Sequence, residues 1–393
     1  MCFSRPPAPG RAAYFAAVDN GPVVTFGPYA GLPNPNRGRL TFLFAHTSDE
    51  DPSGNHFHGI GAYSYEGPVE TPTVTPTNTN NRIPETYTGE SPLRLSVGAG
   101  PLAFRLISKP GNSEYSRLTI ASVHALSAFP ANSPQGYLFN SSGGRWTLPL
   151  TGAVIALKLV AKTEGLHIAN EAGEEILHTV GDLYVLGDGN TFSFTPIFWA
   201  DGQAPAGTYS ATLQFVDVTD TTLPLQESGT FTLNFLVPEP ITGTDGDDVI
   251  VGTPGDDVIF GGAGDDIIMG EGGNDLIYGG AGADIILGGP GNDAIDGGPD
   301  MDIVFGEDGD DTVRHDGSDT IFGGAGKNTI TDISADGGEG EEAGGAPEEG
   351  GEENGAGDGR EEDTDDGDHG HDDPEEDADG DHGHDHDMGE RHS

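Results

Sequence analysis

The sequence GTDGDDVIVGTPGDDVIFGGAGDDIIMGEGGNDLIY (residues 243–278) opens a stretch in which one nine-residue pattern, Gly-x-x-Gly-x-Asp-x-Ile-x, occurs ten times up to residue 331. Later units depart from the pattern, and the unit at 315–322 is one residue short. Glycines at the first, second and fourth positions allow backbone turns that residues with a Cβ disfavour. The eighth position is always Ile or Val, so each unit predicts a short strand that buries its apolar side chain only when stacked on neighbouring units.

Each turn also carries an oxygen ligand, because aspartate occupies the sixth position of the first nine units. Carboxylates and turn carbonyls that recur with each coil suit Ca²⁺, a hard cation with flexible coordination. The predicted calcium-binding residues are Asp248, Asp257, Asp266, Asp275, Asp284, Asp293, Asp302, Asp311 and Asp319, with the fourth-position glycines Gly246, Gly255, Gly264, Gly273, Gly282 and Gly291.

This stretch resembles the GGxGxDxUx nonapeptide repeats of secreted RTX (hemolysin-type) proteins. The resemblance implies a calcium-bound parallel β-roll over residues 241–331. A disordered Gly/Asp-rich tract, the competing interpretation, would not require Ile or Val at every eighth position.

Charge divides the chain into two unlike halves. Residues 1–240 contain 12 Lys/Arg and 20 Asp/Glu, whereas residues 241–393 contain 4 Lys/Arg and 46 Asp/Glu. The net charge of the whole chain is −50, and most of it therefore lies in the second half. Such a polyanion repels nucleic acid and anionic membranes and attracts cations. We therefore expect metal ions and no nucleic acid as partners.

Residues 13–240, which follow a flexible segment at 1–12, are predicted to form an all-β domain. Apolar and polar residues alternate at 39–46, 191–199, 209–218 and 229–237, whereas 153–163 is apolar on both faces and suits the middle of a sheet. Residues 71–81 are expected to form a polar loop, and no long helical periodicity occurs. We expect a β-sandwich or jelly-roll-like architecture.

Three histidines in this domain are candidate zinc ligands: His46, His56 and His58. His56 and His58 project to one face of an extended strand, and His46 ends the preceding strand. If the two strands pair as a hairpin, the three imidazoles and a carboxylate from the loop at 49–51 would converge as a plausible Zn²⁺ site. Surface histidines beside an acidic loop are the alternative, and an isolated His-x-His pattern is more typical of them.

A second resemblance covers residues 12–240. The segments NHFHGIGAYSY, NRIPETYTGE, RWTLPLTGAVIALKLV and LHIAN are similar to a family of secreted cyanobacterial proteins whose genes are repressed by the zinc-uptake regulator and which often end in a PEP-CTERM sorting tail. This resemblance implies a role in extracytoplasmic zinc handling, with His56 and His58 as the natural ligands and His46 beside them. Calcium repeats follow Val237-Pro238-Glu239-Pro240 instead of an apolar helix, which favours free secretion over anchoring.

The sequence shows few signals for disulfide formation, membrane insertion or export. Cys2 is the only cysteine, so no intrachain disulfide can form. The sequence contains no run of 18 apolar residues, so it predicts no membrane span. The first 20 residues are not expected to act as a signal peptide, because their apolar part is short and broken by Pro and Arg. Two explanations stay open: an exporter that reads an uncleaved C-terminal signal, or a true start that differs from the one given.

The C-terminal region divides in two. Residues 332–367 are rich in Gly and Glu and are predicted to be disordered. Residues 368–393 form an acidic tail with six of the thirteen histidines, which favours Zn²⁺ binding over mere solubility, though Cu²⁺ or Ni²⁺ would also bind. The candidate ligands are His369, His371, His382, His384, His386 and His392.

Taken together, these features predict a secreted calcium-binding RTX protein that scavenges zinc outside the cytoplasm, in the extracellular space, the periplasm or at the cell surface, with an exporter or a cell-surface partner. A calcium-dependent adhesin or extracellular-matrix protein without a zinc role is the alternative. We do not expect an enzyme, because the sequence contains no His-Glu-x-x-His and no Gly-x-Ser-x-Gly motif.

Overall fold

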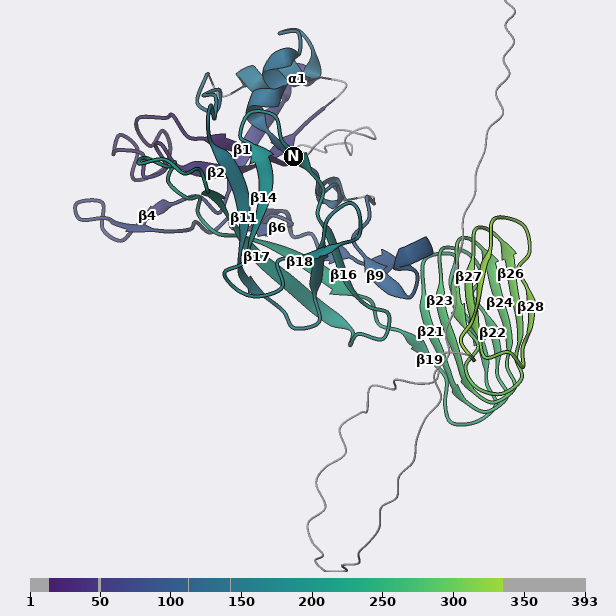
Figure 1. Cartoon of the computed structure of the whole chain (residues 1–393). Helices are drawn as coiled ribbons and strands as arrows, with labels where there is room; N and C mark the ends of the chain where they lie inside the picture. Colours follow the sequence, from purple (N-terminus) through teal and green to yellow (C-terminus); the bar gives the residue numbers. More distant parts are fainter. Residues whose placement is uncertain (1–13, 49–50, 112, 142, 335–393) are drawn as a thin grey trace, which may run out of the picture. The chain divides into compact units, whose positions relative to one another are not determined.

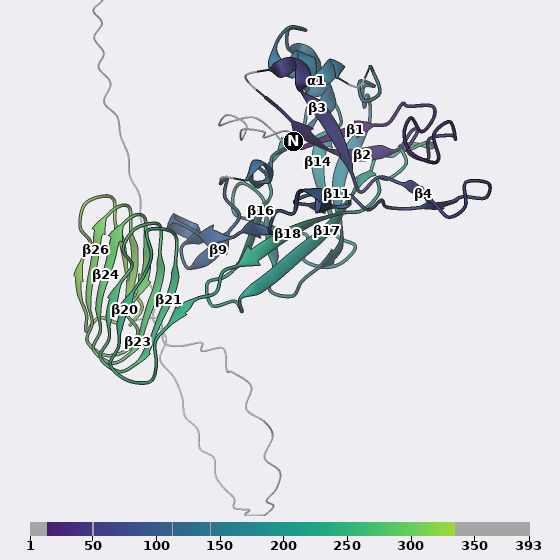
Figure 2. The same cartoon turned by 180° about the vertical axis from the view of Figure 1, so that it is seen from behind.

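The computed structural model describes residues 14–48, 51–111, 113–141 and 143–334. Three sheets build most of the chain up to residue 237, and a stack of parallel coils, green to yellow in Figures 1 and 2, follows from residue 241. The predicted all-β class and the parallel β-roll are therefore confirmed. The predicted flexible segment at 1–12 and the predicted tail at 368–393 lie outside the described residues, as do residues 335–367 of the linker predicted at 332–367. Asp332, the first residue of that linker, is not disordered but ends a strand of the roll.

The first sheet carries the predicted histidines. Its strands are, in spatial order, β15 (Ser193–Phe194), β10 (Ile120–Ser122), β1 (Tyr14–Val18), β2 (Leu40–His46) and β3 (His56–Ile60). All five residues of β1 are buried, as are the first six of β2. A strand buried on both faces must be covered by other elements on both sides.

The second sheet covers one face of the first. Its strands are β14 (Leu183–Asp188), β11 (Val154–Lys162), β17 (Gly207–Asp217), β18 (Phe231–Val237) and β6 (Arg82–Ile83), and β7 (Leu93–Arg94) also pairs with β18. Phe42 of β2 stacks on Phe231 of β18 with ring centroids 3.8 Å apart, inside one large apolar core. This face-to-face packing makes the predicted sandwich.

Helical segments cover the other face of the first sheet. Phe15 and Leu43 belong to a second apolar cluster with Leu126 and Leu138, which lie on the 3₁₀ helix Val123–Ala128 and on α1 (Pro134–Asn140). Ser122 and Ser133 cap these two helices through their hydroxyls. Short 3₁₀ turns also occur at Pro52–Gly54, Thr86–Thr88, Gly100–Leu102 and Glu114–Ser116.

A third sheet and a small hairpin complete this part of the chain. The sheet contains β13 (Glu175–Ile176), β12 (His167–Ala169), β16 (Ile197–Asp201), β9 (Arg105–Ile107) and β8 (Ser96–Val97). The hairpin pairs β4 (Ser64–Glu66) with β5 (Thr73–Thr75). The expectation that 71–81 is wholly a loop is therefore wrong at β5, where alternating threonines pair across to β4.

The roll consists of two parallel sheets built from alternate repeats. One sheet contains β19 (Ile241–Thr242), β21 (Val258–Ala263), β23 (Leu276–Ala281), β25 (Ala294–Asp296), β27 (Thr312–His315) and β29 (Thr329–Asp332). The other contains β20 (Val249–Val251), β22 (Ile267–Met269), β24 (Ile285–Pro290), β26 (Ile303–Asp308) and β28 (Thr320–Phe322). Ile259 pairs with Ile277, so two nonapeptides make one coil of 18 residues.

The eighth-position side chains form the core of the roll, as the sequence predicts. Ile250, Ile259, Ile268, Ile277, Ile286, Ile295, Val304 and Val313 make one buried cluster, with Ile321 packed against it. Among the described residues, no helix is long and apolar enough to cross a membrane.

Candidate metal centres

Two rows of aspartates run along the roll, one for the odd-numbered repeats and one for the even-numbered repeats. In each row the backbone N–H of one aspartate donates to Oδ1 of the aspartate one coil further on, as from Asp257 to Asp275 at 2.9 Å and from Asp275 to Asp293 at 2.8 Å. The short unit at 315–322 reduces this spacing to 17 residues between Asp302 and Asp319. One carboxylate oxygen of each linked residue is thereby committed to holding adjacent coils in register.

The second carboxylate oxygen has no protein partner in six of these aspartates. Their Oδ2 atoms are buried and accept no hydrogen bond, although each residue is at most 2% exposed. The six residues are Asp266, Asp275, Asp284, Asp293, Asp302 and Asp311. Because an unpaired buried carboxylate is costly, these oxygens call for a cation or a proton.

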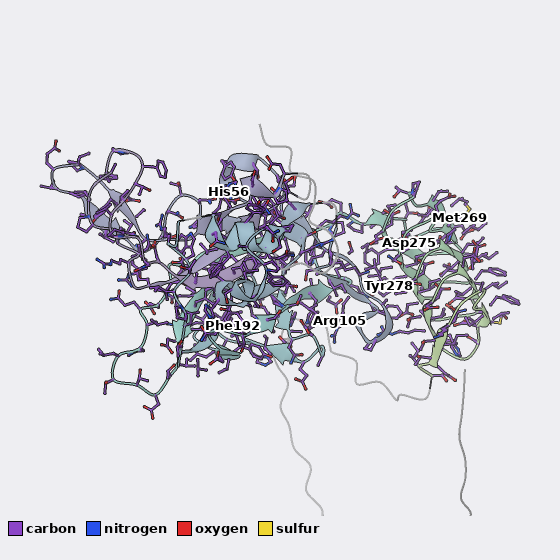
Figure 3. The ribbon with its side chains drawn as sticks, turned by 90° about the horizontal axis from the view of Figure 1, so that it is seen from above. His56, Arg105, Phe192, Met269, Asp275 and Tyr278 are labelled. Atoms are coloured by element: carbon purple, nitrogen blue, oxygen red, sulfur yellow. The ribbon has the colours of Figure 1, made fainter. Side chains whose placement is uncertain are left out.

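Glycines at the first position of the units keep space open beside these oxygens. A Cβ added to Gly261 would lie 2.2 Å from the carbonyl oxygen of Gly279 and 2.6 Å from Asp266 Oδ2. A backbone carbonyl and a carboxylate that face one open space are the donors that Ca²⁺ prefers. The residues therefore fit calcium, and Asp275 is labelled within the roll in Figure 3.

Four of the six fourth-position glycines predicted from the sequence, Gly264, Gly273, Gly282 and Gly291, lie against the adjacent coil, whereas a Cβ added to Gly246 or Gly255 in the first coil would meet nothing within 4 Å. Gly273 adopts φ +116°, and a Cβ there would lie 2.5 Å from the carbonyl carbon of Gly255 in the adjacent coil. These positions let adjacent coils approach closely. The first-position glycines face Oδ2 and were not singled out from the sequence, because every glycine of the repeat looks alike there.

The ends of both rows differ from the middle. Thr244 donates to Asp248 Oδ2 from its N–H (2.6 Å) and its hydroxyl (2.8 Å), and Thr253 does the same for Asp257. At the other end, Asp316 N–H donates to Asp319 Oδ2 at 3.2 Å. Three of the nine predicted aspartates thus have protein donors where the other six have none.

Burial sets the protonation of the middle aspartates when no cation is bound. It raises the pKa of Asp275 to about 8 and the pKa of both Asp293 and Asp302 to about 7, with neighbouring carboxylates adding to the effect. Burial likewise raises the pKa of Asp284 to about 6. Without a cation, Asp275 therefore holds a proton at pH 7, and Asp293 and Asp302 titrate near that pH, whereas Asp284 is protonated only at lower pH.

A second candidate metal centre lies at the edge of the first sheet. Strands β2 and β3 pair antiparallel with His46 opposite His56, so the hairpin predicted from the sequence is present. Nε2 of His46 lies 3.1 Å from Nδ1 of His58. Their approach confirms the expectation that these imidazoles converge.

The carboxylate of this centre comes from Glu85, which was not singled out as a ligand from the sequence. Its side chain is fully buried, and its Oε2 lies 3.3 Å from His46 Nε2 and its Oε1 3.1 Å from His58 Nδ1. His46, His58 and Glu85 each offer one ligand atom, and these atoms lie within 4.8 Å of one another. The three residues form a His₂Glu set suited to Zn²⁺.

The loop at 49–51 does not supply the carboxylate, as far as the structure describes it. Asp51 accepts hydrogen bonds from the N–H and the hydroxyl of Ser53 and caps the 3₁₀ turn that follows. Residues 49 and 50 lie outside the described part of the chain.

His56 lies on the same face as His58, as the sequence predicts, but it is not one of the three residues whose ligand atoms converge. It is exposed, its Nδ1 lies 2.9 Å from Gly54 O, and its Nε2 lies 3.0 Å from Nε2 of His58. It therefore faces the ring nitrogen of His58 that points away from Glu85. This is the place of a residue that orients a ligand.

Opposite charges hold the centre together when it contains no ion. Although burial alone would have the reverse effect on each group, hydrogen bonds to Glu114 and Glu85 raise the pKa of His46 to about 9, and hydrogen bonds from His46, His58 and Asn80 hold the pKa of Glu85 well below its usual value. An imidazolium and a buried carboxylate thus neutralise each other. A metal ion would replace the proton of His46 in that role.

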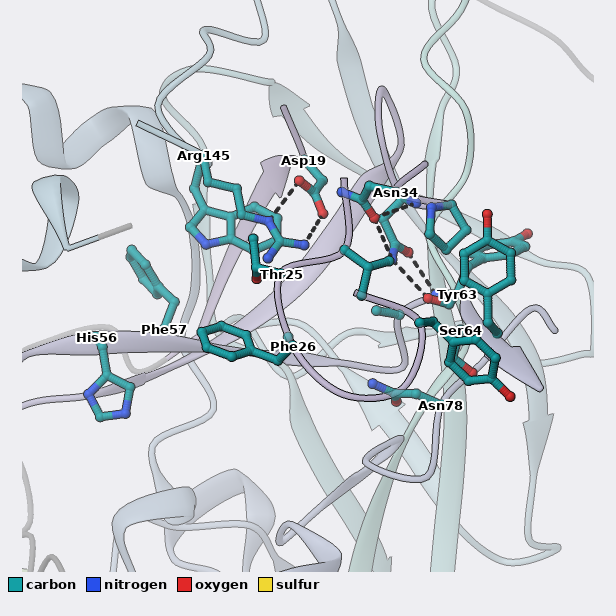
Figure 4. A pocket seen from close by; sticks show the side chains of 18 of the residues that line it. Asp19, Thr25, Phe26, Asn34, His56, Phe57, Tyr63, Ser64, Asn78 and Arg145 are labelled. Atoms are coloured by element: carbon teal, nitrogen blue, oxygen red, sulfur yellow. Dashed lines mark hydrogen bonds and ion pairs between the residues drawn. The ribbon is translucent and has the colours of Figure 1, made fainter. Parts of the chain in front are cut away.

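A cavity of about 700 Å³ lies beside this sheet, with His56 at its edge (Figure 4). Some of its polar side chains pair with one another: Asp19 pairs with Arg145, and Asn34 bonds to Asn36. Asn78, which also lines the cavity, has a buried Oδ1 without a partner.

The remaining predicted zinc ligands, His369, His371, His382, His384, His386 and His392, lie outside the described residues. In the described part, His167 bonds to Glu175 at 2.7 Å and stacks on Trp199. These contacts give His167 a structural role.

Comparison with known proteins identifies the roll. The family model of the RTX calcium-binding nonapeptide repeat matches residues 242–277, 278–313 and 315–331. These residues are therefore RTX repeats, and the chain is a calcium-binding protein. The match does not extend to residues 1–241, and no curated protein matches the chain.

Proposed function

We propose that this calcium-binding protein is secreted and captures zinc outside the cytoplasm. The observation that carries the zinc assignment is the convergence of His46, His58 and Glu85. Two imidazole nitrogens favour a borderline cation such as Zn²⁺ over Ca²⁺, which prefers six or more oxygen ligands. The six histidines of the C-terminal tail add a second, more adaptable set of ligands.

Calcium has a separate task in this proposal. Where calcium is scarce, the aspartate rows repel one another and the roll stays unfolded, which suits export. Outside the cell, binding neutralises the rows, and its free energy becomes folding free energy. The six buried oxygens without protein donors support this dependence.

Zinc titration of the full-length protein in excess calcium at pH 7.5 tests the proposal. We expect His46→Ala/His58→Ala to lose the tightest site and a chain lacking residues 368–393 to keep it while losing weaker sites. No zinc uptake by the intact chain would refute the zinc role. Calcium-dependent attachment to surfaces by a chain that takes up no zinc would favour the adhesin alternative instead.

A further inference from the structure

A fourth polar atom lies close to the three ligand atoms of the proposed zinc cluster, which belong to His46, His58 and Glu85. The hydroxyl oxygen of Tyr87 lies 2.9 Å from His58 Nδ1, 3.2 Å from Glu85 Oε2 and 3.5 Å from His46 Nε2. Tyr87 lies on the 3₁₀ turn Thr86–Thr88, which directly follows Glu85. The same short segment therefore delivers both oxygens to the two histidines of the β2–β3 hairpin.

The four atoms form a nearly regular tetrahedron. The remaining separations are 3.1 Å between the two histidine nitrogens and 3.3 Å from each nitrogen to Glu85 Oε2. All six edges thus fall between 2.9 and 3.5 Å. The centre of such a tetrahedron lies about 2.0 Å from each corner, which matches Zn–N and Zn–O bond lengths.

Hydrogen bonding alone does not satisfy this arrangement. Each ring nitrogen and the Tyr87 hydroxyl have at most one proton to donate, and the Glu85 carboxylate has none, so at most three of the six short separations hold a hydrogen bond. The other separations bring lone pairs against each other. One cation at the centre would satisfy all four atoms together.

Outer contacts orient each of the other three ligands. His46 Nδ1 lies 3.5 Å from Glu114 Oε2, His58 Nε2 faces His56, and Asn80 Nδ2 donates to Glu85 Oε1 at 2.6 Å. Such contacts fix ring orientation and are characteristic of metal sites.

We propose that Tyr87 is the fourth ligand of a preorganised tetrahedral zinc site formed with His46, His58 and Glu85. This inference rests on the proposed zinc capture and makes the site closed rather than open to a bound water. Tyr87 is 62% exposed, so its ring forms the solvent side of the site. A bound dication reverses the local field that Glu85 imposes on the phenol in the ion-free chain.

The test uses the full-length chain in excess calcium, with Zn²⁺ for affinity and Co²⁺ as a spectroscopic substitute. The difference between wild type and His46→Ala/His58→Ala isolates this site from the histidine tail. We expect Tyr87→Phe to weaken zinc binding at the site by about ten-fold or more and to change the intense visible absorption of four-coordinate cobalt. Tyr137→Phe, at an exposed tyrosine in α1, should change neither.

The outcomes separate the two proposals. If wild type and His46→Ala/His58→Ala bind zinc identically, the site itself is refuted, and with it both Tyr87 and the zinc function assigned to this cluster. If the site exists but Tyr87→Phe keeps its affinity and its cobalt spectrum, only the role of Tyr87 is refuted. Tighter binding by Tyr87→Phe would also refute it, because the hydroxyl would then obstruct the ion.

Discussion

In the last coil of the roll, the side-chain amide of Asn328 donates a hydrogen bond of 2.6 Å to the carbonyl oxygen of Gly323. Asn328 stands at the sixth position of the final repeat, where the earlier units have aspartate. Its Oδ1 accepts from Asp311 N–H at 2.9 Å, just as an aspartate does elsewhere in the row. The amide nitrogen of Asn328 thus stands where the other units have Oδ2, and it ends this row with protein atoms alone because it donates to Gly323 without any cation.

Asn328→Asp should extend the row by one calcium-binding position. The substitution removes the donor to Gly323 and leaves a carboxylate oxygen beside that carbonyl, so we expect increased calcium uptake and less order in chelator. Calcium titration and circular dichroism of the intact chain measure both effects. Asn292→Asp, which adds the same charge at a fifth position, should not increase calcium uptake.

Asp275→Asn should have the opposite effect. Asp275 Oδ1 already accepts from Asp257 N–H, so an introduced amide would direct its N–H₂ to the position of the unpartnered Oδ2, as Asn328 does. We expect lower calcium uptake and more residual structure in chelator, because a buried charge is removed. Asp248→Asn is the matched control and should change little, since Thr244 already bonds Asp248 Oδ2. Equal losses of calcium in the two variants would contradict this prediction.

The calcium-free roll should gain order as the pH falls. Burial raises the folded-state pKa of Asp275 to about 8 and that of Asp293 to about 7, whereas an unfolded aspartate titrates near about 4. A raised carboxyl pKa destabilises the fold once the group ionises, so the penalty is absent below about pH 4 and grows as the pH rises towards 8. Circular dichroism of the calcium-free chain should show more strand at pH 5 than at pH 8. The calcium-loaded chain serves as the control and should show no such gain, and equal disorder at both pH values without calcium would contradict the prediction.

The roll was predictable because its nine-residue period determines both the fold and the residues that meet in adjacent coils. Once nine residues make half a coil, Ile259 must meet Ile277, and the aspartates must form rows. The ends were harder to predict. The substitutions at Thr244 and Asn328 are visible in the sequence, but their hydrogen bonds to the rows depend on coil geometry.

The sandwich strands were predictable where alternation is unbroken, as in β17 and β18. The expected strand at 191–199 is instead split into β15 and β16, which belong to different sheets. Pro196 lies at the break and has no N–H to donate to a sheet. The alternating pattern alone does not reveal that change of partner.

The proposed zinc centre shows the same limit. Alternation placed His56 and His58 on one face, but it does not say which distant segment reaches that face. Glu85 and Tyr87 lie there because β6, which comes just before them in the chain, pairs in parallel with β18 at Thr232 and Leu233. That pairing brings together residues about 150 positions apart, and no local pattern encodes it.

A pair of adjacent isoleucines tests whether the eighth-position seam holds the roll together. Ile286 is fully buried in the seam, whereas Ile285 beside it is 38% exposed on the opposite face of β24. Ile286→Ala should destabilise the calcium-loaded roll by about 2–5 kcal/mol. The substitution leaves a cavity in the seam, and the stacked coils cannot move together to fill it. Ile285→Ala should lower the free energy of unfolding by much less, about 0.5 kcal/mol, because this side chain is partly exposed. Urea unfolding in excess calcium compares the two variants. Similar losses would show that the stability of the roll comes from its ions and backbone ladder rather than from the buried seam.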